Sequence, residues 1–415
     1  MTAVPSWYVL NKTWYATAWP PPGPSEDVSG VTTETLLPPP PIKGDPGAEA
    51  LLDRRVDIDG KTALVASLLK DLQCEGLLLL EPDNFAWLTS GAVARGALDP
   101  ASAPALYCNG EHRWVLASNT DSQRLFDEEL DGLGFQLKEW PWHWGRDQLL
   151  ADLCQNRRVA CDRPFGTAVP AGEALRRLRR KLTLYEQACL RATGQIVAHS
   201  LEATCRTCGR GQTEREIAGQ ISHRLIHRGA QALRIGVAGD GRSRTYRRFS
   251  FTAFPVEHYA IVTATARKYG LHVTASRTVS FGSLPEDLHK DHNAVCRVGA
   301  SYLASTWPDA VPREILLAGR RIYLISGFEH EWALSPQGHA TGRAPIELGL
   351  TPQTEELFQS GWAVTWDVRA GAAVGCDTFL VTEQGPASVT PTEVWPLKRI
   401  RIQGAEFVRP DVLVR

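Results

Sequence analysis

The chain has 415 residues, of which 43% are hydrophobic, and this length favours two cores because single cores stop growing below it. The 45 basic side chains nearly balance the 46 acidic ones, leaving a net charge of -1. Charge therefore gives no support for a nucleic acid or an anionic membrane as the partner. A small molecule or a peptide remains as the expected ligand.

The sequence also argues against export and membrane insertion. No stretch approaches the roughly 20 apolar residues that a membrane-spanning helix needs, and the first residues lack a basic segment followed by an apolar run. The nine cysteines are odd in number and scattered, unlike the disulfide framework of a secreted domain. We expect reduced thiols and a cytoplasmic location.

Residues 1–50 are predicted to form an N-terminal arm. Prolines cluster at 20–24 and 38–41, which disfavours helices and central strands there. The arm also carries Trp7, Trp14 and Trp19, which are unusual in a tail without contacts. We expect the arm to contact a domain or a second subunit.

Residues 51–172 are predicted to form an α/β domain. A helical pattern at 61–72 precedes an apolar run at 76–80, and two further short apolar runs follow later helical segments, at 114–117 and 158–161. Short buried strands that alternate with helices are typical of a layered α/β arrangement.

Residues 173–395 are predicted to form a second domain, followed by a tail at 396–415. Apolar residues recur at helical spacing over 182–203, and the capping-box sequence at 213–216 predicts a second helix that ends at Gly229. Further helices are expected at 288–306 and 315–325. Short β-branched runs predict antiparallel strands, at 259–263, 271–274, 363–366 and 378–381. The expected class is α+β, a curved antiparallel sheet covered by helices.

Several segments, taken in order, resemble the creatinase, prolidase and Xaa-Pro aminopeptidase superfamily, known as the pita-bread fold. Residues 84–89 resemble its "N-x-x-W-L-T" segment, and residues 211–216 resemble "G-x-T-E-x-E". Residues 338–347 are similar to "G-H-G-I-G-x-x-x-H-E", while 361–368 and 376–382 are similar to its closing hairpin. The resemblance covers roughly residues 55–395 and implies a two-domain peptidase-like protein, as a divergent subgroup.

The resemblance implies five metal-ligand positions, because active members hold two metal ions with two Asp, one His and two Glu. In this sequence those positions carry Thr263, Thr274, His339, Asp367 and Cys376. Two neutral threonines replace the paired aspartates, and a hydroxyl does not offset a divalent charge. We therefore expect no metal cofactor. The alternative is one divalent ion held by His339, Asp367 and Cys376.

The resemblance also implies His339 and Glu347 as the retained catalytic candidates. The superfamily's second histidine aligns with Ile346, which has no proton to transfer, whereas Glu347 is kept and is also suited to anchoring the loop. A structural role for His339 in a glycine-rich turn is the competing interpretation.

Creatinase hydrolyses a C–N bond without metal, and this offers a second model for the chain. The corresponding histidine is replaced here by Arg247 or Arg248, which puts that catalysis in doubt. Planar guanidinium groups bind carboxylates in bidentate fashion. Four arginines are therefore candidate ligand-binding residues, Arg242, Arg244, Arg247 and Arg277. A solvated loop or an interface contact is the competing interpretation.

Three functional hypotheses follow. The first is an inactive or repurposed relative of Xaa-Pro aminopeptidases that binds a small peptide-like or carboxylate-bearing ligand. The second is a working C–N hydrolase, a peptidase or a creatinase-type enzyme, with a metal-free or single-metal site. The third is an assembly module that uses the arm and the arginines as contacts. The resemblance also implies a homodimer.

Overall fold

The computed structural model describes residues 48–94 and 103–415. The arm predicted for residues 1–50 falls almost entirely outside the described residues. Between Pro46 and Arg415 the chain forms one compact unit. Among the described residues, no helix combines the length and the apolar character that crossing a membrane requires.

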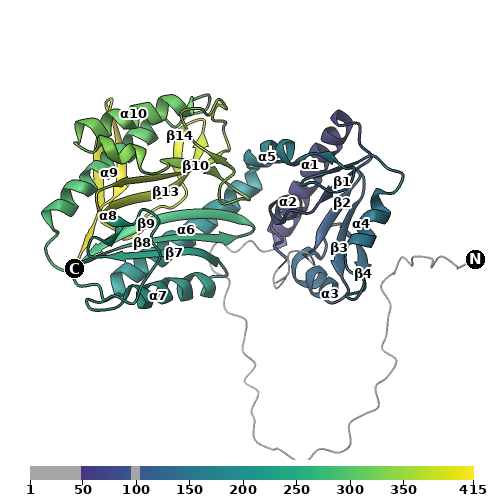
Figure 1. Cartoon of the computed structure of the whole chain (residues 1–415), viewed down its shortest axis with the longest axis horizontal. Helices are drawn as coiled ribbons and strands as arrows, with labels where there is room; N and C mark the ends of the chain where they lie inside the picture. The colour runs from purple at the N-terminus through teal and green to yellow at the C-terminus, as the bar shows by residue number, and fades with distance from the viewer. Residues whose placement is uncertain (1–47, 95–102) are drawn as a thin grey trace, which may run out of the picture. The chain divides into compact units, whose positions relative to one another are not determined.

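The first part of the described chain is a six-stranded mixed sheet with helices around it (Figure 1). Its strands lie in the order β4-β3-β2-β1-β5-β6, with β1 antiparallel to β2 and parallel to β5. The strands are β1 (Gly76–Leu79), β2 (Ala105–Cys108), β3 (Arg113–Ser118), β4 (Gln136–Trp140), β5 (Val159–Cys161) and β6 (Val169–Pro170). The helices are α1 (Ala48–Asp71), α2 (Pro82–Leu88), α3 (Ser122–Leu125), a π-helical turn (Phe126–Leu130), α4 (Asp147–Cys154) and α5 (Gly172–Arg180).

Strand β1 lies inside this sheet, between β2 and β5, and all four of its residues are buried. Its leucines alternate between two cores, with Leu77 and Leu79 in one and Leu78 in the other. A strand covered on both faces reads as a continuous apolar run, which is the pattern that predicted it.

Two long helices follow and cover one face of a second sheet. Both α6 (Leu184–Thr207) and α7 (Glu214–His227) begin with a complete capping box, Thr183 with Glu186 and Thr213 with Glu216. The predicted capping box at 213–216 is therefore confirmed. The sheet has the order β17-β9-β8-β7, formed by β7 (Gln231–Gly239), β8 (Tyr259–Lys268), β9 (Leu271–Ser280) and β17 (Leu413–Val414), with the short helix α8 (Arg242–Thr245) after β7.

Helix α6 approaches the rest of the chain very closely at Gly194. A Cβ atom at this position would lie 1.9 Å from the carbonyl oxygen of Val389. Only glycine permits this distance without moving the backbone. Helix α6 shares one apolar core with Val389 and with β8 and β9.

A third sheet is antiparallel throughout, in the order β11-β10-β12-β13-β14. Its strands are β10 (Gly338–Thr341), β11 (Leu348–Gly349), β12 (Ala363–Ala370), β13 (Ala373–Thr382) and β14 (Gly385–Ser388). Helices α9 (Glu286–Ala304) and α10 (Pro312–Ile325) and a 3₁₀ turn (Glu329–Ala333) share a core with it. In that core Tyr302 of α9 stacks on Trp366 of β12 with ring centroids 4.6 Å apart.

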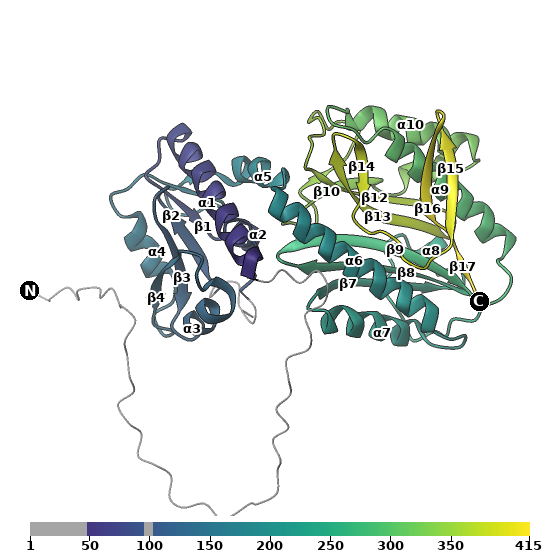
Figure 2. The ribbon, with the colours of Figure 1, turned by 180° about the vertical axis from the view of Figure 1, so that it is seen from behind.

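The segment predicted as a tail, residues 396–415, forms regular structure. Strands β15 (Leu397–Ile402) and β16 (Ala405–Pro410) make a hairpin that lies against α9, as seen from behind in Figure 2. Strand β17 then adds to β9 in parallel orientation. The predicted helices and strands of residues 173–395 are otherwise confirmed, although the strands extend as much as six residues beyond their expected bounds.

Candidate functional site

Four buried strands become half-exposed at the residues that the sequence singled out. Strand β9 has one half-exposed residue, Thr274; β10 has His339; and β12 has Asp367. In β8 the half-exposed positions begin at Thr263. With Cys376, which is buried, these residues are called the central cluster below. A polar, partly exposed set of residues inside otherwise buried sheets is the natural candidate for a binding site.

Strand register brings the central cluster together. Asp367 lies directly opposite Cys376 across β12 and β13, and His339 lies opposite Thr365 across β10 and β12. In the other sheet Thr274 pairs with Thr265, two residues from Thr263 and therefore on the same face.

A chain of hydroxyl groups connects the two sheets at this point. Thr274 and Thr265 approach with 3.0 Å between their Oγ1 atoms, and so do Thr365 and Thr378. Thr378 joins the two pairs: its Oγ1 accepts from the backbone N–H of Thr274 at 3.1 Å and donates to the carbonyl of Thr274 at 2.9 Å. The four residues are called the hydroxyl chain below. It is electrically neutral.

The carboxylate of the central cluster already has a counter-charge. Arg369 binds Asp367 with both arms, Nε to Oδ1 at 3.1 Å and Nη2 to Oδ2 at 3.0 Å. The guanidinium also lies over the ring of Phe249 and donates to the backbone oxygen of Arg247. A bidentate pair of this kind fixes both the position and the charge of the carboxylate.

His339 and Cys376 are both held in their neutral forms. Burial lowers the pKa of the His339 imidazole, and the nearby Asp367 opposes this effect only in part. Burial raises the pKa of the Cys376 thiol well above its ordinary value. A metal requires the thiolate, so the protonated thiol is a poor ligand. Over residues 48–94 and 103–415, no group of three His, Cys, Asp or Glu side chains is arranged to hold a metal ion.

Glu347 is tied to a loop and to the first part of the chain. Its carboxylate accepts from Arg179 Nε at 2.8 Å and from the backbone N–H of Ala344 at 2.8 Å. Arg179 also donates to Asn84, which belongs to the segment 84–89 that carried part of the resemblance. Burial raises the pKa of Glu347, and Arg179 counters it. These contacts fit the anchoring role, and a catalytic role for Glu347 stays a prediction.

Each of the four arginines proposed for ligand binding has a carboxylate partner inside the protein. The closest ion-pair distances are 2.8 Å for Arg242 with Glu214, 3.0 Å for Arg244 with Asp291, 2.6 Å for Arg247 with Glu331 and 2.9 Å for Arg277 with Asp377. Arg277 is fully buried and binds Glu202 as well. An anion would have to compete with these partners, so the ligand-binding assignment stays a prediction.

No protein-family model matches the chain, and no curated protein matches it in sequence. Solved structures do match. The prolidase from Pyrococcus furiosus superimposes with a TM-score of 0.68 at 15% identity, covering 79% of this chain and 100% of that one. The dipeptidase PepE from Mycobacterium ulcerans gives 0.69 at 16% identity, covering 87% and 98%.

The fold is that of the prolidases. The predicted α+β class and the two-domain pita-bread architecture are thereby confirmed. The same fold also matches a protein of another kind, the N-terminal domain of FACT complex subunit SPT16 from chickpea, with a TM-score of 0.58 at 9% identity, covering 82% of this chain and 96% of that one. At these identities the likeness establishes the fold and leaves the activity open.

Two features of this prolidase fold were not predicted from the sequence, namely Arg369 and the hydroxyl chain. Arg369 follows Asp367 by two residues in a strand, so both side chains lie on one face. That spacing was a readable signal. The hydroxyl chain had no such signal, because Thr274 and Thr378 are far apart in sequence and meet only when two sheets come together.

A second polar region connects helix α1 with helix α6 and with the loop after β10. Glu186 accepts from Lys61 Nζ at 2.7 Å and from Arg343 Nη2 at 2.8 Å, and Lys61 also contacts Asp57 at 2.7 Å. These four residues are called the charged network below. Burial alone would raise the pKa of Glu186, but Lys61 and Arg343 outweigh it and lower the pKa to about 2. The network links α1, α6 and the loop after β10.

Proposed function

We propose that this chain is a repurposed relative of the prolidases that binds a small peptide-like or carboxylate-bearing ligand at the central cluster without cleaving it. The observation that supports this most directly is the bidentate pair of Arg369 and Asp367. The pair places the positively charged guanidinium of Arg369 directly beside Asp367, the carboxylate of the central cluster.

The proposal rests on charge balance. Two adjacent divalent ions need bridging carboxylates, because neutral oxygens do not compensate their charge at a partly buried site. At the aligned positions Thr263 donates to the backbone oxygen of Gly236 at 3.3 Å, and Thr274 belongs to the hydroxyl chain. Both hydroxyls are thus used in neutral hydrogen bonds within the protein.

The chemistry of the central cluster suits a hydrogen-bonding ligand. The hydroxyl oxygens of its half-exposed threonines keep acceptor lone pairs beside their internal bonds. His339 offers a neutral imidazole that both donates and accepts, and Asp367 offers an acceptor. Peptide amides and carboxylates are complementary to this mixture of donors and acceptors.

The second candidate function is a C–N hydrolase with a metal-free or single-metal site. It is favoured by His339, because an imidazole that burial keeps neutral beside Asp367 is able to accept a proton. A single ion held by His339, Asp367 and Cys376 would require Arg369 to release Asp367 and Cys376 to lose its proton.

Metal analysis combined with two functional assays tests the proposal. Protein purified without chelator is examined for bound zinc, manganese and cobalt, for hydrolysis of Xaa-Pro dipeptides, and for binding of the same dipeptides by calorimetry. We expect binding without hydrolysis. Hydrolysis with stoichiometric metal would overturn the proposal in favour of a metallopeptidase.

His339→Ala separates the two candidate functions. If the chain is a binding protein, the variant keeps most of its affinity for the dipeptide. If the chain is a hydrolase built on His339, the variant loses turnover, by a factor of about 100 or more. Thr382→Ala, at the end of β13, is the control.

The homodimer and the cytoplasmic location stay predictions. Light scattering of the full chain tests the first, where the mass of a single chain at all concentrations would contradict it.

A further inference from the structure

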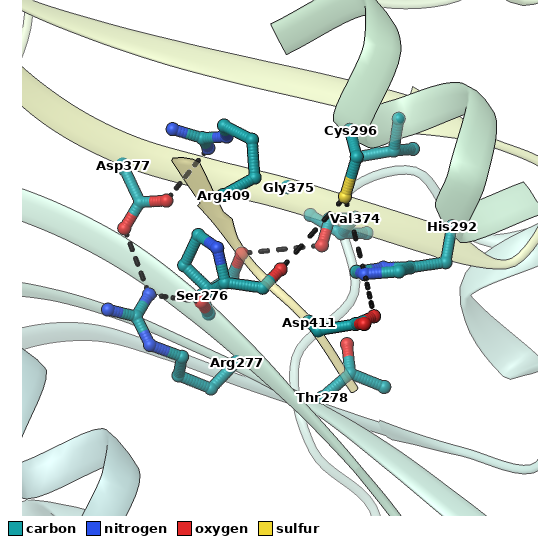
Figure 3. A pocket seen from close by; sticks show the side chains of 12 residues that line it. Ser276, Arg277, Thr278, His292, Cys296, Val374, Gly375, Asp377, Arg409 and Asp411 are labelled. Atoms are coloured by element: carbon teal, nitrogen blue, oxygen red, sulfur yellow. Dashed lines mark hydrogen bonds and ion pairs between the residues drawn. The ribbon is translucent and has the colours of Figure 1, made fainter. Parts of the chain in front are cut away.

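A small cavity lies between α9, β9, β13 and the end of β16 with the residue that follows it (Figure 3). Its volume is about 20 Å³, room for one small solvent-sized molecule and too little for a peptide. Among its lining residues are His292 and Cys296 from α9, and Asp411 from the segment after β16.

Three of the lining side chains form a row. The Sγ atom of Cys296 lies 3.3 Å from Nε2 of His292, and the same Nε2 lies 3.1 Å from Oδ1 of Asp411. Figure 3 shows the imidazole between the sulfur and the carboxylate. His292 and Cys296 are four residues apart on a helix and therefore on one face of it.

Helix α9 holds this face firmly against the sheet. A Cβ atom on Gly375 of β13 would lie 2.5 Å from Cγ1 of Val295, so the helix and the strand are in close contact. Cys296 is 2% exposed and His292 is 4% exposed, while the side chain of Asp411 is 32% exposed. The row thus runs from solvent at Asp411 to a buried thiol.

His292 is polar, almost fully buried and incompletely bonded. Its Nδ1 has no hydrogen-bond partner among the described residues, although the ring lines a cavity large enough for a small polar molecule. Burial alone lowers the pKa of His292, but Cys296 and Asp411 outweigh that effect and raise it to about 9. The imidazole therefore carries a proton near neutral pH.

The charges around this imidazole are accounted for on every side. Cys296 faces it from α9 and Asp411 from the segment after β16, and Lys398 acts on Asp411 from β15. Arg409 and Arg277, which also line the cavity, are both bound to Asp377. His292 is consequently the basic side chain that lies next to the Cys296 sulfur, with Nε2 3.3 Å from Sγ.

Other thiols of the chain lack this environment. Burial raises the pKa of seven of them, Cys108, Cys154, Cys161, Cys189, Cys205, Cys208 and Cys376. Cys376 is the best internal comparison, because it lies in β13 next to cavity-lining residues and is 3% exposed, much like Cys296.

We propose that Cys296 is a modification site, a thiol that small peroxides oxidise with the help of His292. The thiolate sulfur attacks one peroxide oxygen, an S–O bond forms and the O–O bond breaks. The departing hydroxide takes the Nε2 proton of His292 and leaves as water. The products are a sulfenic acid on Cys296 and a neutral His292, so the peroxide is reduced and the sulfur is oxidised. The small cavity limits the oxidant to hydrogen peroxide or a similarly small hydroperoxide.

Sulfenic-acid trapping on the full chain tests this proposal. Reduced protein is treated with hydrogen peroxide and dimedone at neutral pH, digested, and the adduct on each cysteine is quantified by mass spectrometry. We expect Cys296 to be labelled at least about tenfold faster than Cys376, and His292→Asn to slow the labelling of Cys296 by about tenfold or more. Cys296→Ser identifies the signal.

His289→Asn is the matched control, because His289 lies on the same helix about one turn earlier and is exposed. It should leave the labelling rate of Cys296 unchanged. Equal rates for Cys296 in the wild type and in folded His292→Asn would overturn the proposal. If His292→Asn does not fold, the wild-type protein decides: labelling of Cys296 no faster than that of Cys376, while all nine cysteines react after denaturation, overturns it too.

Discussion

The charged network and the central cluster differ in how they accommodate polar side chains inside the protein. The charged network buries a carboxylate, Glu186, and compensates it with Lys61 and Arg343. The central cluster lies at the positions where the sequence resemblance implies carboxylate ligands, and there the chain has hydroxyls and a single internal ion pair. The charged network contains several buried charges that compensate one another, whereas the central cluster has one carboxylate, Asp367.

This difference shows that the chain is able to bury carboxylates wherever cations are built in beside them. A neutral central cluster is therefore a local property and not a general shortage of buried charge. It follows that the two regions should respond differently to mutation, to pH and to added metal ions.

The largest effect is expected from breaking the charged network. Glu186→Gln leaves Lys61 and Arg343 without their shared anion, and we expect the free energy of unfolding to fall by about 3 to 5 kcal/mol. Urea denaturation measures the change. Glu406→Gln, which removes an exposed partner of Arg399, is the control and should have no measurable effect. A similar small change for Glu186→Gln would show that the network contributes little.

A somewhat smaller effect is expected from acid, through His272. Its Nδ1 lies 3.1 Å from the carbonyl of Gly342, and burial lowers its pKa to about 4. The unfolded chain binds a proton near pH 6.5, so stability is full above that pH and falls as the pH drops toward 4, by about 3 kcal/mol in total. His272→Asn keeps a donor to Gly342 and should remove this component. Denaturation curves between pH 4 and 7 that match the wild type would contradict the assignment.

A third prediction concerns replacing the two threonines of the central cluster by aspartates. In Thr263→Asp/Thr274→Asp two new carboxylates lie near Asp367 without a cation, and we expect a loss of about 2 to 3 kcal/mol in the presence of chelator. Manganese or cobalt should restore stability in the variant and leave the wild type unchanged, as measured by thermal melting. Thr213→Asp, at the first residue of a capping box, is the control because aspartate is also a good N-cap. Equal stabilisation of the wild type by metal would contradict a neutral cluster.

The smallest effect is expected from interrupting the hydroxyl chain. Thr378→Val keeps the shape of the side chain but removes the hydroxyl that bonds both Thr274 and Thr365, and we expect a loss of about 1 to 2 kcal/mol. Thr382→Val, farther along β13 and half-exposed, should cost less because water replaces its partner. If the two variants cost the same in urea denaturation, the hydroxyl chain has no special role in joining the sheets.

Sequence reasoning succeeded where the signal was local. The capping box at Thr213 was readable in four residues, and the strands at 259–263 and 363–366 were visible as β-branched runs. The resemblance then gave the fold and the positions of the central cluster. The strand register places Asp367 opposite Cys376 and Thr274 opposite Thr265, and the use of these positions as a ligand site stays a prediction.

Pairings between distant side chains were out of reach. The contact of Arg179 with Glu347 and that of Lys61 with Glu186 join residues from different parts of the chain, and no periodicity encodes them. Four arginines were proposed for a ligand because guanidinium groups bind carboxylates, and their carboxylate partners within the protein could not be read from the sequence. Arg277, for example, turned out to be fully enclosed by Glu202 and Asp377.

Strand β17 has a consequence for how the protein reaches its final state. Leu413 and Val414 pair in parallel with Val279 and Ser280 of β9. The edge of that sheet is therefore completed only by a segment that lies more than a hundred residues later in the sequence. Contacts between such distant segments form slowly, because a large loop must close before any stabilising contact is gained. We expect β8 and β9, which are linked by the short turn at Tyr269 and Gly270, to assemble early and β17 to dock late.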